Sequence, residues 1–178
     1  MSAPWLVRSA RNTKKDRALL KAFSCADGAF RWQAEVEDFI RAALFDWAFE
    51  PLAKPRDPRL LFTFARSTME LVGVAAHERV TLQHRRGARF AATKLEVVAI
   101  ARRWQGQMFE PGVRASDVIM SAVMADIEHR VPPRHARVFA VVHEDNARSI
   151  ALARRYGFVE ELSRPHPSYR RLLTGHRG

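Results

Sequence analysis

The stretch 138–158, VFAVVHEDNARSIALARRYGF, decides the fold because it contains a strand, a helix cap, a helix and a helix stop in succession. The apolar run 137–142 predicts a strand that is buried on both faces. Asp145 or Asn146 can cap the following helix. Gly157 marks the end of that helix, where a left-handed residue is favoured. The stretch therefore predicts a buried strand followed directly by a helix.

Working back along the chain, the pattern predicts a second strand parallel to the first. Residues 93–101 form a long run of strand-forming residues, and residues 115–129 predict a helix with one apolar stripe. Because a helix separates the strands 93–101 and 137–142, they should lie parallel and be joined by a right-handed crossover. The stripe consists of Val118, Ile119, Ala122, Val123 and Ile127.

The remaining segments change from helical to extended periodicity near residue 60. Apolar residues at spacings of three and four predict one amphipathic helix over 32–47, and the prolines in 51–59 predict a stiff connector after it. Shorter patterns predict a strand at 5–8, a helix at 16–23, a hairpin of 60–65 with 70–77, and a closing strand pair of 158–163 with 168–173. The whole pattern predicts a single α/β domain over residues 1–178.

The composition predicts a soluble, cytoplasmic protein. The 178 residues are 47% hydrophobic and 28% charged, which is an ordinary globular balance. Cys25 is the one cysteine, and the sequence has neither a signal peptide nor an apolar run of about eighteen residues that would cross a membrane. The net charge of +11 has two explanations, a codon bias toward arginine or a polyanionic partner such as RNA. A homodimer is also compatible with the sequence.

Two segments resemble the GNAT superfamily of N-acetyltransferases. In residues 96–107, EVVAIARRWQGQ, an acidic residue stands ten positions before Gly106, similar to that superfamily's fourth strand and glycine-rich acetyl-CoA loop. The stretch 138–158 is similar to its fifth strand and fourth helix, with matches at Asn146, Ser149, Leu152, Gly157 and Phe158. The resemblance implies a mixed, mostly antiparallel sheet with flanking helices, in which the central parallel pair splays apart.

The resemblance also implies acetyl-CoA as a co-substrate that lies between the two parallel strands. Pantetheine would meet the strand, and the pyrophosphate would rest on the glycine turn. Residues 108–112 stand where the superfamily has its later loop glycines, which predicts a short insertion before the helix. The implied cofactor-binding residues are Val98, Ala99, Ile100, Arg102, Gln105, Gly106, Gln107, Gly112 and Asn146.

Glu96 is the catalytic base that the resemblance implies. A lysine-type amine with a pKa near 10.4 is neutral only about once in 2,500 molecules at pH 7, a deficit of about 4.6 kcal/mol. A carboxylate that is partly desolvated by Val97 and Val98 can accept that proton, directly or through water. An α-amine has a deficit of only about 1 kcal/mol and needs a base less. The alternative is an ion pair of Glu96 with Lys94 or an arginine.

The general acid differs from the superfamily, which often has a tyrosine at the position of Ala153. Tyr156 and Ser149 are the candidates to protonate the leaving thiolate, and packing beside Phe158 or an ordinary surface hydroxyl are the alternatives. The run His143-Glu-Asp predicts no metal site, because adjacent side chains at a strand end diverge.

These features predict an enzyme that transfers acetyl from acetyl-CoA directly to an amine in a ternary complex. The acceptor stays open between a small amine, a protein N-terminus and the α-amine of an aminoacyl-tRNA, on which toxins of this superfamily act. Phe23-Ser-Cys25 resembles a segment of that toxin group. The alternative from another class is a non-catalytic, nucleic-acid-binding module of the same fold with a degenerate cofactor loop.

Overall fold

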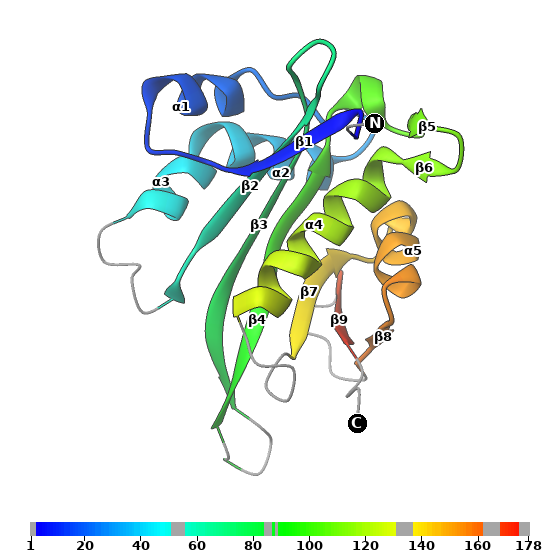
Figure 1. Cartoon of the computed structure of the whole chain (residues 1–178). Coiled ribbons are helices and arrows are strands. Elements are labelled where there is room, and N and C mark those ends of the chain that lie inside the picture. Colours follow the sequence, from blue (N-terminus) through cyan, green and yellow to red (C-terminus); the bar gives the residue numbers. More distant parts are fainter. Residues whose placement is uncertain are drawn as a thin grey trace.

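A mixed β-sheet forms the centre of the computed structural model, which describes residues 3–50, 56–83, 87, 89–130, 137–161 and 168–174. Its strands are β1 (Trp5–Ser9), β2 (Arg59–Ala65), β3 (Glu70–Gln83), β4 (Arg89–Ile100), β7 (Val138–His143), β8 (Phe158–Glu160) and β9 (Tyr169–Thr174). They lie in the order β1-β2-β3-β4-β7-β9-β8 (Figure 1). All neighbours are antiparallel except β4 and β7, which confirms the mixed sheet with a parallel central pair.

Helices cover both faces of this sheet (Figure 1). One face carries α1 (Lys14–Lys21), α2 (Arg31–Ala42) and α3 (Leu44–Phe49). The other face carries α4 (Ala115–Arg130) and α5 (Ala147–Arg155). Between β4 and α4 lie the short helix η2 (Arg102–Trp104) and a hairpin of β5 (Met108–Glu110) with β6 (Val113–Arg114). Within the described ranges, none of the helices has the length and apolar character that a membrane crossing requires.

The helix predicted over 32–47 is wrong in one respect, because it is two helices. Ala43 separates α2 from α3 with φ −118° and ψ −30°, which departs from helical geometry. Ile40, Leu44 and Phe45 are all buried against the sheet. Ile40 belongs to α2, whereas Leu44 and Phe45 belong to α3, so the helices on both sides of the break bury apolar residues on the same face of the sheet.

Two apolar clusters follow from the alternation of side chains along the strands. Phe62 and Phe64 of β2 pack with α1, α2 and α3, whereas Leu61 packs with α4 and α5. On α4, Ile119 and Val123 of the predicted stripe are buried against the sheet. The predicted helix 115–129 and the two parallel strands that it connects are thereby confirmed.

The other predicted strands agree with the structure where it describes them. Strands β2 and β3 form the predicted hairpin, and β3 continues to Gln83. Strands β8 and β9 form the predicted closing pair. The insertion predicted at 108–112 is the β5–β6 hairpin. Most of the predicted connector, residues 51–55, lies outside the described residues.

At Gly73 of β3, α4 lies so close to the sheet that a side chain would have no room. A Cβ atom at this position would lie 2.1 Å from Ile119 Cδ1 and 2.9 Å from the carbonyl oxygen of Ala99. Both distances are shorter than van der Waals contact. The absence of a side chain at Gly73 therefore lets α4 pack directly on β3 and β4.

A partly buried charged cluster joins α4 to the middle of β3. His77 is 4% exposed, and its Nε2 lies 2.8 Å from Asp126 Oδ2. Arg59 and Arg130 approach the same carboxylate oxygen at 3.6 and 3.3 Å. Burial lowers the pKa of His77 despite the opposing effect of Asp126. Burial raises the pKa of Asp126, but His77 and the arginines outweigh it and lower this pKa overall.

We predict that Gly73→Ala lowers the free energy of unfolding by about 1–3 kcal/mol, because the new methyl group overpacks the contact with Ile119. Ile119→Val alone removes Cδ1 and should lower it by about 0.5–1.5 kcal/mol. The double variant should lose less than the sum of the two, as measured by urea denaturation. Additive losses would show that Ile119 does not limit this contact.

We predict that stability falls on acidification from pH 7.5 to 5.5, partly through His77. The unfolded chain protonates this residue below about pH 6.5, whereas the folded chain resists protonation because the pKa of His77 is lowered by burial. Stability should fall by up to about 1.4 kcal/mol per pH unit between the two pKa values. Asp126 adds its own loss only below about pH 3.8, since its folded pKa is also lowered. In urea denaturation, His77→Gln should flatten the slope between pH 7.5 and 5.5, and an unchanged slope would contradict this origin.

Candidate active site

Strand β4 contains one extra residue, and that residue is Glu96. On β3, the neighbours Ala76 and His77 pair with Val97 and Leu95 of β4, which leaves Glu96 opposite no residue. Such a β-bulge bends its strand and reverses the alternation of backbone directions beyond it. The bulge is the local cause of the geometry of the site.

The bulge ends the pairing between β4 and β7. These strands pair only over Thr93–Leu95 with Val138–Ala140. Before the bulge, the amide of Thr93 donates to the carbonyl of Arg137 on the β7 side, whereas after it the amide of Ala101 donates to Val72 of β3. By alternation, the backbone groups of Val98 and Ile100 point into the gap, and those of Ala99 pair with β3.

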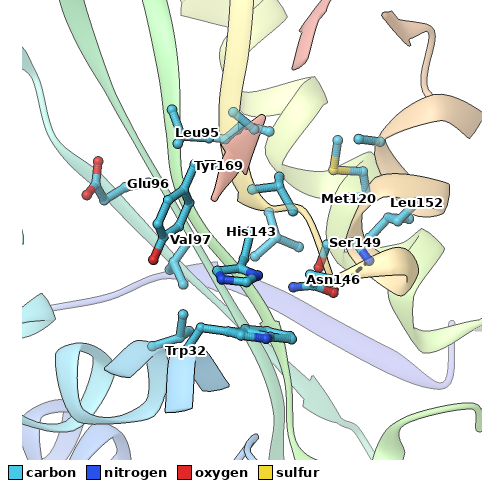
Figure 2. A pocket seen from close by; sticks show the side chains of 16 residues that line it. Trp32, Leu95, Glu96, Val97, Met120, His143, Asn146, Ser149, Leu152 and Tyr169 are labelled. Carbon is cyan, nitrogen blue, oxygen red and sulfur yellow. Dashed lines mark hydrogen bonds between the residues drawn. The ribbon is translucent and has the colours of Figure 1, made fainter. Parts of the chain in front are cut away.

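The gap between the strands is a crevice with a volume of about 150 Å³. One wall is β4 with Glu96 and Val98, and the other is β7 with the start of α5. Met120 of α4 and Trp32 of α2 also line it, so both helical layers contribute side chains (Figure 2).

Glu96 lies at one side of the crevice, across from Ser149 and Asn146 (Figure 2). Its Oε2 atom is 2.6 Å from Lys94 Nζ, so the ion pair that the sequence left open does form. Across β3, Glu78 pairs in register with Lys94. Burial raises the pKa of Glu78, with Arg56 opposing the effect and Glu96 adding to it. Lys94 therefore lies beside two carboxylates.

The predicted cofactor loop around Gly106 is a tight turn with hydrogen bonds between its own backbone groups. Gly106 and Gly112 have positive φ angles of 76° and 82°, a conformation that favours glycine. The amide of Gln107 donates to the carbonyl of Trp104 at 3.1 Å, and the amide of Gln105 donates within the same turn at 3.3 Å. Gln105 and Gln107, two of the residues predicted to bind the cofactor, thus use their amides inside the turn.

The arginine predicted for the cofactor lies elsewhere. Arg102 lines a separate hollow beside α1 together with Arg103, which forms an ion pair with Glu70. Arg148, in the first turn of α5, donates instead to Gln105 Oε1 at 3.3 Å. It is a cation beside the loop that sequence reasoning missed, because nothing in its local pattern distinguishes it from a surface arginine.

Comparison with solved structures finds several proteins of similar fold, acetyltransferases among them. A protein from Desulfovibrio desulfuricans assigned to the GNAT family has a TM-score of 0.63 and 14% identity, covering 95% of this chain and 96% of that one. PaiA N-acetyltransferase from Thermoplasma acidophilum in complex with coenzyme A has a TM-score of 0.62 and 13% identity, covering 98% and 99%. A mutant AtaT toxin bound to the C-terminus of the antitoxin AtaR and acetyl-CoA has a TM-score of 0.63 and 11% identity, covering 96% and 94%.

The chain has the GNAT fold. No protein-family model and no curated protein matches its sequence. The resemblance predicted from residues 96–107 and 138–158 is therefore confirmed by the fold, including the order of the strands.

The general-acid candidates differ in their relation to the GNAT crevice. Ser149 lines the crevice together with Ala153, and Asn146 Oδ1 accepts a hydrogen bond from the Ser149 amide as the helix cap. The Tyr156 hydroxyl instead donates to the carbonyl of Asp117 at 2.8 Å and lies 2.7 Å from Ser121. Ser149 and Asn146 therefore line the crevice, whereas the Tyr156 hydroxyl is hydrogen-bonded to residues of α4.

Hydrogen bonds hold the loop between α1 and α2 beside the end of β4, where the crevice lies. The Glu37 carboxylate accepts hydrogen bonds from Ser24 and from the amides of Cys25 and Ala26 at 3.1, 2.7 and 2.8 Å. Desolvation raises the pKa of Glu37, but these hydrogen bonds outweigh it and lower the pKa overall. Gln105 Nε2 donates to the Cys25 carbonyl at 2.7 Å and to Ile100 at 3.2 Å. Gln105 thus joins three separate segments.

Aromatic residues at the crevice were the largest omission of sequence reasoning. Trp32 stacks on His143, with ring centroids 5.4 Å apart and an angle of 14°. Tyr169 meets His143 edge-on at 5.1 Å. Trp32 was predicted as part of an apolar helix stripe, and no local signal distinguishes a core tryptophan from one at a crevice. Trp104, which follows β4, packs against Phe109 with ring centroids 5.2 Å apart.

Metal ligands do not gather in the described ranges, where no group of three histidine, cysteine or acidic residues is suitably placed. His143 Nδ1 accepts a hydrogen bond from the Asp145 amide at 3.3 Å. That contact belongs to the turn between β7 and α5.

We predict that the Cys25 thiol reacts about 1,000-fold more slowly with iodoacetamide at pH 8 than an unperturbed thiol. Burial raises its pKa from 9.0 to about 12, and only the thiolate reacts. Mass spectrometry of the native protein and of a guanidinium-unfolded control measures the two rates. Equal rates in both states would show that Cys25 is available as a nucleophile.

Proposed function

We propose that the protein is an acetyl-CoA-dependent N-acetyltransferase that transfers acetyl to an amine by direct attack. The observation that carries this proposal is the crevice between β4 and β7, which opens at the Glu96 bulge. A narrow gap between a strand edge and a helix start suits a slender arm with amide groups and a thioester at its end. The acetyltransferases of the same fold support this reading.

The donor side consists of β4, β7 and α5. Val98 and Ile100 direct backbone groups into the gap, where they would pair with the amides of a pantetheine arm. The crevice is otherwise mostly apolar, which excludes water from the reacting carbonyl. Gly106 and Arg148 would meet the phosphates, since Gly106 has no side chain and Arg148 supplies positive charge.

Glu96 is the proposed base. When the amine nitrogen attacks the thioester carbonyl, a C–N bond forms, the C–S bond breaks, and the nitrogen loses a proton. The Glu96 oxygen that Lys94 does not hold can take this proton. The leaving thiolate needs little help, because a thiol has a pKa near 8.5. Ser149 is the hydroxyl in the crevice that could protonate it.

Direct attack is favoured over an acyl-enzyme because the one cysteine cannot readily serve as a nucleophile. Burial raises the pKa of Cys25 to about 12, and its backbone is held by Glu37 and Gln105. Cys25 is also absent from the residues that line the crevice. In the proposed reaction the amine meets the thioester directly, in a ternary complex.

We predict that Glu96→Gln lowers kcat/KM for a high-pKa amine by about 100- to 10,000-fold, because the amine loses its proton acceptor. The dissociation constant for acetyl-CoA should change little, since the amide keeps the size of the side chain. A thiol-release assay against an amine panel measures the first quantity, and calorimetry measures the second.

The matched control is Glu128→Gln, which makes the same change on the exposed surface of α4 and should leave both quantities unaltered. Equal rates for Glu96→Gln and Glu128→Gln would contradict the proposed base. If wild type binds no acetyl-CoA but binds RNA with strong salt dependence, the protein is instead a nucleic-acid-binding module. The net charge of +11 makes that outcome the relevant rival.

A further inference from the structure

Exposed apolar side chains gather at one end of the crevice. Of the six large hydrophobic residues that are exposed in the described part of the chain, Phe30 (51%), Val36 (38%) and Val141 (37%) lie at this one place. Single exposed hydrophobic residues are ordinary, whereas a cluster beside a cavity indicates binding of an apolar group. We call Phe30, Trp32, Val36, Val141, His143 and Tyr169 the aromatic mouth.

The rings of the aromatic mouth form a continuous stack. Phe30 and Trp32 are nearly parallel, with centroids 6.0 Å apart and an angle of 15°. Trp32 continues onto His143, and Tyr169 closes the series edge-on. Figure 2 shows Tyr169 and His143 between Glu96 and Asn146, with the Trp32 ring below His143. Flat parallel rings favour a planar partner, because offset stacking adds to the burial of apolar area.

The stack is more than the packing of the α2 N-terminus. Phe30 is the N-cap residue of α2, and its side chain makes no capping hydrogen bond. A residue that served only to begin the helix would be serine, threonine, aspartate or asparagine. Phe30 also leaves about half of its surface in solvent, so it contributes little to the core.

The charges of the crevice limit the acceptor further. Among the described residues that line it, Glu96 is the one carboxylate, and no lysine or arginine is present. One carboxylate suits an acceptor with one amine beside an uncharged group. A polyamine would need further carboxylates, and the net charge of +11 repels it. A phosphate in the crevice would meet no cation among the lining residues, and Lys94, which lies beside Glu96, is already held in an ion pair.

We infer that the acceptor is a primary amine carried next to an aromatic ring, which the aromatic mouth binds while Glu96 faces the amine. The inference rests on the proposed function and names the substrate class of the same site. The ring and amine can come from a free arylalkylamine or from an aromatic amino acid with a free α-amine. Both present the same chemistry to Trp32 and Glu96.

The experiment compares acceptors that differ only in the ring. We expect wild type to acetylate phenethylamine with a kcat/KM about tenfold or more above that for butylamine, and to prefer phenylalanine amide to alanine amide by a similar ratio. A high ratio in both pairs supports the class, and the faster member of phenethylamine and phenylalanine amide identifies the source. Equal values within each pair, or a preference for spermidine, would overturn the inference while leaving the transferase intact.

Variants of the mouth test the residues. Trp32→Leu should bring the phenethylamine-to-butylamine ratio close to one, whereas Trp32→Phe should keep most of it. Phe30→Ala should lower the ratio without unfolding the protein, because Phe30 is half exposed. Val159→Ala is the matched control, since Val159 is 59% exposed on β8 and does not line the crevice. A ratio that stays at the wild-type value in both Trp32→Leu and Phe30→Ala would overturn the inference.

A binding readout separates this inference from the proposed function. Ligand-observed NMR with phenethylamine and butylamine reports binding even if no acetyl transfer occurs. Binding of phenethylamine alone, lost in Trp32→Leu and kept in Val159→Ala, supports the aromatic mouth although the transferase proposal would then fail. Absence of phenethylamine binding together with absence of turnover would overturn both.

Discussion

The extra residue in β4 is the constraint on which the site depends. Two hydrogen-bonded strands that continue in register have no room between them, so a ligand can enter only where the ladder ends. The bulge at Glu96 ends it by turning the backbone groups of Ala99 toward β3 and those of Val98 toward the gap. Glu96 is both the extra residue that ends the strand pairing and the carboxylate of the crevice. The proposed base therefore always lies at the point where the two strands separate.

An open sheet needs support from elsewhere, because the strand pairs beyond Leu95 are missing from the ladder between β4 and β7. The two helical layers provide this support with separate apolar clusters on the two faces. At the open end, Gln105 joins the α1–α2 loop, the end of β4 and Arg148 of α5. Its amide group donates on one side and accepts on the other, which a glutamate could not do. The width of the crevice is thereby held by side chains rather than by strand pairing.

The sequence predicted the architecture because periodicity and crossover rules act over whole elements. The 3.6-residue stripe of 115–129 between two apolar runs was sufficient for the parallel pair. The bulge left no such trace, since Glu96 lies in the run Leu95-Glu-Val-Val98 and its pairing depends on β3. The break at Ala43 was missed because the apolar spacing of 32–47 continues through it. The likeness of sequence motifs identified Glu96, Ser149 and Asn146 as candidates. Trp32, His143 and Tyr169 come together only through tertiary packing, which leaves no local pattern.

The two sides of the crevice belong to different layers of the molecule, and this determines how substrates can meet. Lys94, the partner of Glu96, pairs across the sheet with Glu78, which lies on the same face as Ala76 and therefore on the α1–α3 side. Ser149, Leu152 and Met120 approach from the side of α4 and α5. An amine that reaches Glu96 past Trp32 therefore comes from one face, and a thioester held by α5 comes from the other. Their carbon and nitrogen atoms can meet only within the split between β4 and β7. For the proposed transferase, this geometry favours direct attack and would give the α1–α3 layer, rather than the glycine turn, the control over which amine reacts.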